Sequence, residues 1–134
     1  VIEIPVTGVQ YFSDGESSFK FEKKNLKKIS SLNKRNKIKI VVSRSHLDSF
    51  TINLLNKIKN EHSTLKVGSS IKFCLVAEGE ADLYLRKGNT MEWDTAAAHS
   101  ILNALDIHVI NLETGRELSY NKEHLLNPYF IIKA

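Results

Sequence analysis

The sequence predicts an α/β protein in which helices cover a mixed sheet, preceded by a β-hairpin from a first, antiparallel sheet. Two patterns lead to this fold class. From residue 38 onward, short β-branched runs alternate with segments whose apolar residues recur at helical spacing. Before that point, two extended runs flank the turn signal Ser13-Asp14-Gly15. With 134 residues, 42% of them hydrophobic, the chain can bury a core without disulfide bridges.

The first 36 residues are expected to form the hairpin and a connector. Residues 1–6 and 9–12 read as extended chain, and Pro5 indicates a strand end or a sheet edge. Residues 18–21 can return after the turn as the partner strand. The Lys-rich stretch that follows is expected to be a connector. We therefore predict that 1–36 belong to the sheet of an N-terminal half and that 37–134 form a C-terminal α/β domain.

The second part alternates between strands and helices. The run Ile38–Val42 predicts a strand, and Ser45 with Asp48 fits a capping box at the start of the helix after it. The apolar face of that helix is expected to comprise Leu47, Phe50, Leu54 and Ile58. The remaining expected elements are a strand at 65–67, a helix at 70–78 with Phe73, Val76 and Ala77 on its apolar side, a strand at 81–85, a helix starting near Asp94 with Ala97, Ile101, Ala104 and Leu105 on one face, and strands at 108–112 and 129–132.

Composition limits the class of protein. The single cysteine, Cys74, excludes an internal disulfide and favours a reducing compartment. No apolar run approaches the roughly 20 residues that a membrane-spanning helix needs. We therefore expect a cytoplasmic protein that does not enter a membrane. The chain begins within an apolar run and without Met, so it is expected to be a fragment or a processed piece of a longer protein.

The formal net charge of +4 comes from one stretch of the chain. Residues 20–39 hold nine of the 19 Lys and Arg residues and one of the 15 acidic residues. The remainder carries 10 basic and 14 acidic residues, so its formal charge is −4. The simpler interpretation of 20–39 is a solvated surface segment. The alternative is a patch that binds anions or nucleic acid, although its aromatic residues, Phe19 and Phe21, stand only at its start.

Polar residues gather where predicted strands give way to helices. These corners are 43–46, 68–72 and 93–95, and Arg86 lies at the end of another strand. In open α/β sheets, ligands bind at the carboxyl ends of strands. The corner from Gly68 to Lys72 offers a tight turn, two hydroxyl groups and a lysine, which is competent to hold a phosphate. The same residues also fit an ordinary turn with a helix cap.

Asp94 has two interpretations at its corner. It can cap a helix that begins at Thr95, or it can be a ligand of Mg²⁺, which prefers carboxylate oxygens. One carboxylate does not make a metal site by itself. His46, at the start of a predicted helix, is more often a surface or capping residue than a general base. Cys74 and Tyr84 are expected in the core, because no His close in sequence could activate the thiol.

Four motifs resemble the C-terminal half of the inositol monophosphatase superfamily, and within it the bisphosphate nucleotidases. They are VVSRSH at 41–46, GSSIKFCLVAEGEADLYLR at 68–86, WDTAAAHSIL at 93–102 and LNPYF at 126–130. The first 16 residues are similar to the hairpin in the middle of these proteins. The resemblance implies the C-terminal half of that superfamily's layered α/β sandwich, with 37–134 as its substrate-binding domain.

The resemblance also implies an activity and a set of residues. The activity is Mg²⁺-dependent hydrolysis of a phosphomonoester, with removal of the 3′-phosphate from adenosine 3′,5′-bisphosphate. The Trp-Asp motif makes Asp94 a Mg²⁺ ligand at the substrate site. The residues implied to bind the nucleotide are His46, Ser69, Lys72 and Arg86. Proteins of this superfamily often form homodimers.

The chain departs from the family pattern at decisive places. The other metal ligands of the family lie in an upstream Glu-Glu segment and an Asp-Pro-(Ile/Leu)-Asp-Gly-Thr segment, and neither occurs here. Ala98 stands where a Gly is usual, and Leu105-Asp106 where a Gly pair is common. We therefore expect no catalytic residue in this chain and no activity from it alone. An N-terminal half, in the same or a separate chain, would have to supply the rest.

Two other functions remain open from the sequence. One is an inositol monophosphatase-type sugar phosphatase, although Ser69, Lys72 and Arg86 suit a nucleotide with two phosphates better. The other is a non-catalytic remnant that binds phosphate or nucleic acid through 20–39 and the Gly68 corner. Its binding would weaken steeply with salt and would need no Mg²⁺.

Overall fold

The computed structural model describes residues 1–30, 37–44, 49–58 and 61–134, and these contain two β-sheets. Sheet A comprises β1 (Ile2–Ile4), β2 (Val9–Ser13), β3 (Ser18–Glu22) and β4 (Asn25–Lys28), in that order and antiparallel throughout. Sheet B comprises β5 (Ile38–Ser43), β6 (His62–Val67), β7 (Leu83–Arg86), β8 (Val109–Asn111) and β9 (Phe130–Lys133). The helices are α1 (Ser49–Lys57), α2 (Ile71–Ala77) and α3 (Glu92–Asn103).

Sheet B is mixed, as the alternation of strands and helices predicted. Its strand order is β6-β5-β7-β9-β8. The strands β6, β5 and β7 are parallel, whereas β9 runs antiparallel to both of its neighbours. The carboxyl ends of the three parallel strands therefore lie at one edge of the sheet. The segments that leave those ends carry the polar corners of the sequence.

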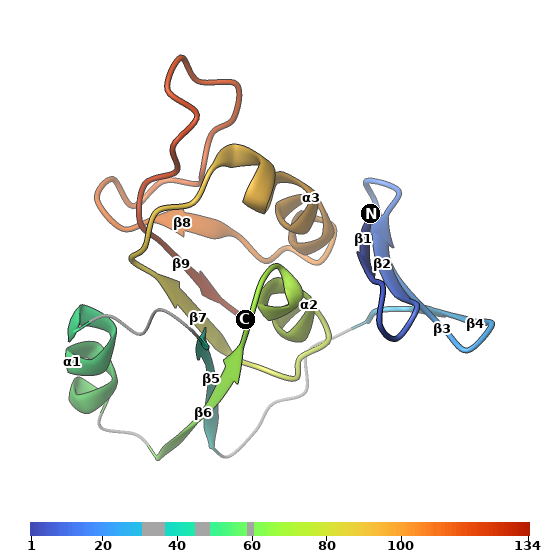
Figure 1. Ribbon diagram of the computed structural model, residues 1–134, viewed down its shortest axis with the longest axis horizontal. Coiled ribbons are helices and arrows are strands. Elements are labelled where there is room, and N and C mark those ends of the chain that lie inside the picture. Colours follow the sequence, from blue (N-terminus) through green and yellow to red (C-terminus); the bar gives the residue numbers. More distant parts are fainter. Residues whose placement is uncertain (31–36, 45–48, 59–60) are drawn as a thin grey trace.

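The sheets and helices form layers. Figure 1 shows α2 and α3 between the two sheets, with α1 on the opposite side of sheet B. Residues of both sheets and both inner helices share one buried cluster, which includes Val9, Val41, Val76 and Leu102. Ser18, which is fully buried on β3, donates a hydrogen bond of 2.6 Å to the carbonyl of Ile101 in the last turn of α3. Sheet A is thus joined to α3 by apolar packing and by a helix-end hydrogen bond.

The prediction that the Lys-rich stretch is only a connector was wrong, because β4 forms within it. Lys23 and Lys24 form a two-residue turn with φ values of 50° and 63°, which brings β4 antiparallel to β3. Such left-handed turns usually use Asn-Gly, so a Lys pair gave no turn signal. All four residues of β4 are exposed. An exposed strand has no alternation of buried and exposed residues, and its lysines suit a sheet edge.

Helix α3 begins earlier than expected and buries a different face. It starts at Glu92 rather than at Thr95. Ile101 is buried as predicted, but Ala97 is exposed, and the buried side includes the polar residues Thr95 and His99. The prediction failed because an apolar-face argument treats polar residues as exposed. After α3, Asp106 adopts a left-handed φ of 58°, a conformation that Asp tolerates better than most residues.

The other expected elements are mostly confirmed, with small shifts at their ends. Helix α2 buries Phe73, Val76 and Ala77, and Cys74 and Tyr84 lie in the core as predicted. The proposed capping residues Ser45 and Asp48 lie outside the described residues, as do Leu47 and the side chains of Phe50 and Leu54. Within the described part of the chain, no helix is long and apolar enough to cross a membrane.

Candidate functional site

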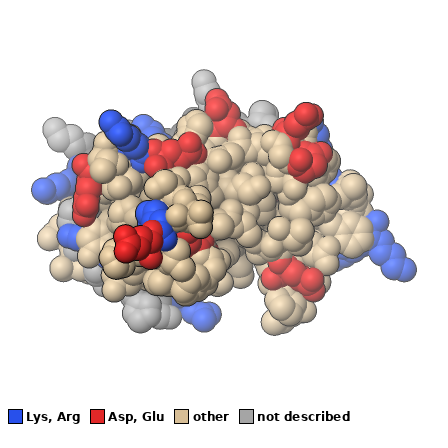
Figure 2. All heavy atoms as spheres, turned by 90° about the horizontal axis from the view of Figure 1, so that it is seen from above, with Lys and Arg blue, Asp and Glu red and all other residues tan. Residues whose placement is uncertain are grey.

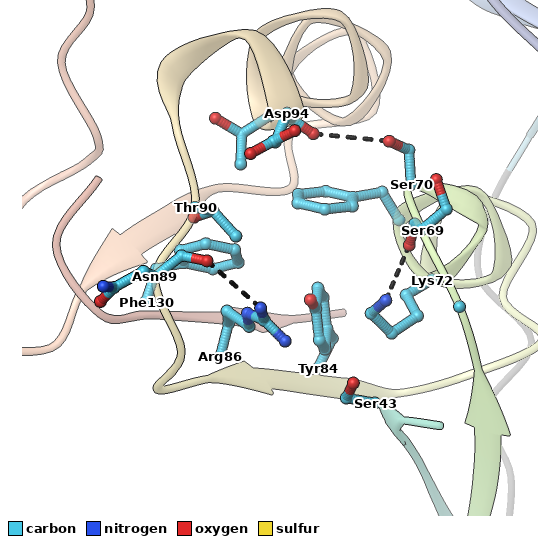
Figure 3. A pocket seen from close by; sticks show the side chains of 13 residues that line it. Ser43, Ser69, Ser70, Lys72, Tyr84, Arg86, Asn89, Thr90, Asp94 and Phe130 are labelled. Carbon is cyan, nitrogen blue, oxygen red and sulfur yellow. Dashed lines mark hydrogen bonds between the residues drawn. The ribbon is translucent and has the colours of Figure 1, made fainter. Parts of the chain in front are cut away.

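A pocket of about 270 Å³ lies at the carboxyl ends of the parallel strands of sheet B. Ser43 lies at the end of β5, Gly68 directly after β6, and Arg86 at the end of β7. The start of α3 contributes Asp94 from the opposite side (Figure 3). The parallel topology therefore brings four segments that are distant in sequence to one cavity.

The turn between β6 and α2 is held by the side chains of Lys72 and Ser70. Ser69 has a left-handed φ of 53°, an unusual conformation for a residue with a side chain. The ammonium group of Lys72 donates a hydrogen bond of 2.7 Å to the carbonyl of Ser69. The hydroxyl of Ser70 donates to the carbonyl of Asp94 at 3.4 Å. These two bonds stabilise the turn and connect it to the first turn of α3.

Lys72 is a buried cation. Only 4% of its surface is exposed, and its Nζ lies 5.2 Å from the centre of the Tyr84 ring. Burial, together with the positive charge of Arg86, lowers the pKa of Lys72 from 10.5 to about 8. Among the described residues its partners are a carbonyl oxygen and an aromatic ring, so its positive charge is not balanced by a carboxylate. A bound anion would balance that charge.

Arg86 is the second cation of the pocket. Its Nε donates to the carbonyl of Gly88 at 3.2 Å and its Nη2 to the carbonyl of Asn89 at 3.3 Å. Figure 3 shows Arg86 and Lys72 on either side of Tyr84. Within the residues that the structure describes, neither cation forms an ion pair with a carboxylate. Two such cations at a strand-end cavity make it suitable for a phosphorylated ligand.

Asp94 occupies the third position of α3 and acts as a cap from there. Its Oδ2 accepts a hydrogen bond of 2.8 Å from the backbone N–H of Met91. Asp94 does cap α3, as one interpretation predicted, but it does so from inside the helix and not from the position before it. The side chain is exposed at the pocket, so its carboxylate remains accessible to a cation.

The described residues do not form a metal site by themselves. They contain no group of three or more His, Cys, Asp or Glu side chains arranged to hold a metal ion. Asp94 is the carboxylate among the residues that line the pocket. The donor set therefore fits one ligand of a Mg²⁺ ion that would take its other ligands from elsewhere.

A chain of largely part-buried hydrogen bonds supports the start of α3. The Tyr120 hydroxyl donates to Thr95 Oγ1 at 3.2 Å and also lies 2.8 Å from Nδ1 of His99. The other ring nitrogen of His99 lies 2.8 Å from Glu117. Asn127 Nδ2 donates to Thr95 Oγ1 at 3.0 Å and to the carbonyl of Met91 at 2.8 Å. Residues 117–127 thus hold the segment that carries Asp94.

The structure brings Ser69, Lys72, Arg86 and Asp94 together, whereas His46 lies outside the described residues. The roles of these residues as ligands stay predictions. Ser43 and Thr95 belong to the polar corners that the sequence indicated, whereas the sequence argument did not place Tyr84, Asn89, Thr90 or Phe130 at the pocket. Tyr84 could have been found, because strand alternation places it on the same side of β7 as Arg86. Phe130 could not, because it comes from a strand 44 residues further along the chain.

The fold and the pocket together define a layered α/β protein with a cationic cavity at the ends of its parallel strands. The chain belongs to the inositol monophosphatase family, whose sequence model matches residues 1–129. It is 42% identical over 131 residues to the 3′(2′),5′-bisphosphate nucleotidase CysQ of Salmonella typhimurium, and 41% identical to that of Escherichia coli. Each match covers 97% of this chain and 52% of the relative.

Solved structures agree with this assignment. CysQ from Bacteroides thetaiotaomicron, a bacterial member of the inositol monophosphatase family, is 37% identical and superimposes with a TM-score of 0.89. That match covers 100% of this chain and 56% of the other. The PH1897 protein from Pyrococcus horikoshii, at 18% identity and a TM-score of 0.69, shares the fold. The chain spans about half the length of the curated relatives that it matches.

Proposed function

We propose that the intact protein is a Mg²⁺-dependent phosphomonoesterase that removes the 3′-phosphate from adenosine 3′,5′-bisphosphate. The observation that carries this proposal is the pocket itself, where Lys72 and Arg86 lie without a carboxylate partner among the described residues and Asp94 is exposed nearby. The names of the CysQ relatives support the choice of a bisphosphorylated nucleotide as substrate.

Each residue that the sequence predicted for the site has a proposed part in this function. Lys72 and Arg86 bind and neutralise phosphate groups, and Ser69 contributes a hydroxyl beside them. Asp94 supplies one carboxylate to Mg²⁺, and His46 contacts the sugar or its phosphate. A bound Mg²⁺ ion would activate water and neutralise charge on the transferred phosphoryl group. The hydrogen bond from Met91 fixes the orientation of Asp94 for this role.

The described residues hold one wall of the active site in this proposal. Residues 1–36 would extend the sheet of an N-terminal half, and 37–134 would form the substrate-binding domain. The N-terminal half would supply the remaining metal ligands, so the 134-residue chain alone is expected to be inactive. The intact enzyme would work in the cytoplasm, and a homodimer is its proposed assembly.

The face shown in Figure 2 does not support a nucleic-acid function. Lys23, Lys24, Lys27 and Lys28 are exposed on the β3–β4 hairpin. On the face shown in Figure 2, however, acidic and basic side chains are interspersed. A face of mixed charge does not produce the extended positive potential that sequence-independent binding to nucleic acid uses.

A chimera tests the proposed function directly. The upstream half of the Escherichia coli relative, which is 41% identical over the shared part, would be fused to Val1 of this chain. We expect phosphate release from adenosine 3′,5′-bisphosphate in the presence of Mg²⁺, and much slower release from inositol 1-phosphate. The 134-residue chain alone should release none. A chimera that prefers inositol 1-phosphate would favour the sugar phosphatase instead.

Matched substitutions in the chimera test the metal ligand. Asp94→Asn should lower kcat/KM by at least about 100-fold, because it removes a negatively charged ligand of the ion. Asp106→Asn is the control, since Asp106 is exposed and Asn tolerates its left-handed backbone. Equal activity of the two variants would show that Asp94 binds no catalytic metal.

A further inference from the structure

The guanidinium group of Arg86 lies against Gly88, in the loop that follows β7. A Cβ atom placed on Gly88 would lie 3.1 Å from Cζ and from Nη2 of Arg86, and 3.3 Å from Nε. These distances are shorter than ordinary van der Waals contacts. Arg86 also donates to the carbonyls of Gly88 and Asn89. The loop therefore holds the arginine by close packing and by two hydrogen bonds.

Gly88 is required for space and not for backbone conformation. Gly8, Gly15 and Gly115 have positive φ values, and a Cβ on any of them would meet no atom within 4 Å. Gly88 shows the reverse, because its φ lies outside the left-handed region while a Cβ would contact Arg86. An alanine could adopt its backbone conformation. The absence of a side chain at position 88 thus serves the placement of Arg86.

The two hydrogen bonds leave part of the guanidinium available to a ligand. Arginine has five N–H donors in a planar group. One N–H of Nε and one of Nη2 point to the loop carbonyls, so three remain. Because the loop fixes the plane of the group, these donors reach the pocket with little loss of side-chain entropy on binding.

We propose that Gly88 is a positioning residue that holds the guanidinium of Arg86 in the orientation needed to bind a phosphate group of the nucleotide. This inference rests on the proposed function, since that function supplies the ligand. Gly88 itself does not touch the substrate. Its effect on binding passes entirely through Arg86.

The test compares Gly88→Ala with Arg86→Ala and with the double variant in the 134-residue chain. The affinity for adenosine 3′,5′-bisphosphate would be measured by titration calorimetry. Gly88→Ala should weaken binding about tenfold or more in the otherwise unchanged chain, as expected for a displaced charged hydrogen bond. Gly88→Ala should change the affinity less than about twofold when Arg86 is already Ala, because Gly88 affects binding only through the Arg86 side chain. Equal weakening in both backgrounds would overturn the proposal.

The melting temperature separates positioning from folding. Gly88→Ala should leave the melting temperature within about 2 °C of the unchanged chain, because the crowded atoms are the end of a flexible side chain that can move away. Unfolding or a large loss of stability would show that Gly88 serves the fold, and would overturn the proposal.

A ligand-free measurement separates this inference from the proposed function. The ¹⁵N–¹H resonance of Arg86 Nε would be assigned by its loss in Arg86→Ala. Gly88→Ala should shift this resonance and speed its exchange with water. If neither the unchanged chain nor the chimera binds the nucleotide but the resonance responds in this way, the positioning role stands and the proposed function falls. An unchanged resonance would refute the positioning role, whatever the ligand.

Discussion

The buried charge of Lys72 should lower the free energy of unfolding of the unliganded protein. The variant Lys72→Met, which has no charge at this position, measures the size of that effect. The lysine is 4% exposed, and its pKa in the folded protein is lowered from 10.5 to about 8 by burial and by Arg86. A lowered pKa means that the folded state binds fewer protons than the unfolded state between these values. Stability should therefore rise with pH from about 8 to about 10.5.

The size of this effect follows from the shift. At pH 7 the charged lysine costs about 3 kcal/mol of folding free energy, and at pH 9.5 the cost falls to about 1 kcal/mol. Met has a similar length and carries no charge, so Lys72→Met removes this cost. It also removes the hydrogen bond from Lys72 to the carbonyl of Ser69. The variant should be more stable than the unchanged chain at pH 7, and its advantage should shrink by about 1 to 2 kcal/mol at pH 9.5.

Urea unfolding at pH 7, 8, 9 and 9.5 provides the assay, with Lys27→Met as the control. Lys27 is exposed on β4, so its substitution should not change the pH dependence. Phosphate should stabilise the unchanged chain but not Lys72→Met, because ligand binding adds to the stability of the folded state. A difference between Lys72→Met and the unchanged chain that stays constant from pH 7 to 9.5 would refute the reasoning about burial.

Three further predictions concern the support of the site. Tyr120→Phe should cost about 1 to 3 kcal/mol, because it removes a bond to Thr95 and leaves Nδ1 of buried His99 without that partner; Tyr129→Phe, measured by the same urea titration, is the control and should cost less than about 0.5 kcal/mol. Ser18→Ala should lower stability by about 1 to 2 kcal/mol in thermal unfolding, since Ser18 satisfies a carbonyl at the end of α3; an effect no larger than that of exposed Ser119→Ala would contradict this. A hydrogen bond to Glu117 raises the pKa of His108 above 6.5. Protonated His108 should therefore stabilise the folded protein, and this contribution should be lost as the pH rises through the raised pKa. His108→Asn should show no such loss of stability between pH 6 and 8.

Local patterns in the sequence identified several of the residues that line the pocket. The spacing from Ser69 to Lys72 lies within one turn, so neighbouring residues alone place the lysine beside the turn. Alternation of strands and helices predicted the mixed sheet, and parallel strands bring the ends of β5 and β7 to one edge. The placement of Arg86 at the pocket follows from that topology.

Where the sequence prediction failed, the missing information was not local. β4 was missed because an exposed edge strand shows no burial pattern, and because the turn at Lys23 and Lys24 lacks the usual residues. The buried face of α3 was misjudged because Thr95 and His99 are polar. They can be buried because Tyr120, Glu117 and Asn127, which lie 18 or more residues away, provide hydrogen-bond partners.

The sequence by itself determined the class of fold, the family and the residues that stand at the strand ends. Those properties depend on residue types at short spacings, and such local patterns are present in the sequence before any tertiary contact forms. The tertiary structure alone decided that Lys72 is a buried cation with a lowered pKa, that Gly88 gives Arg86 its place, and that Tyr120 and Asn127 support the segment with Asp94. These properties depend on burial and on contacts between distant segments, and electrostatic energies respond to that environment more strongly than to the residue type.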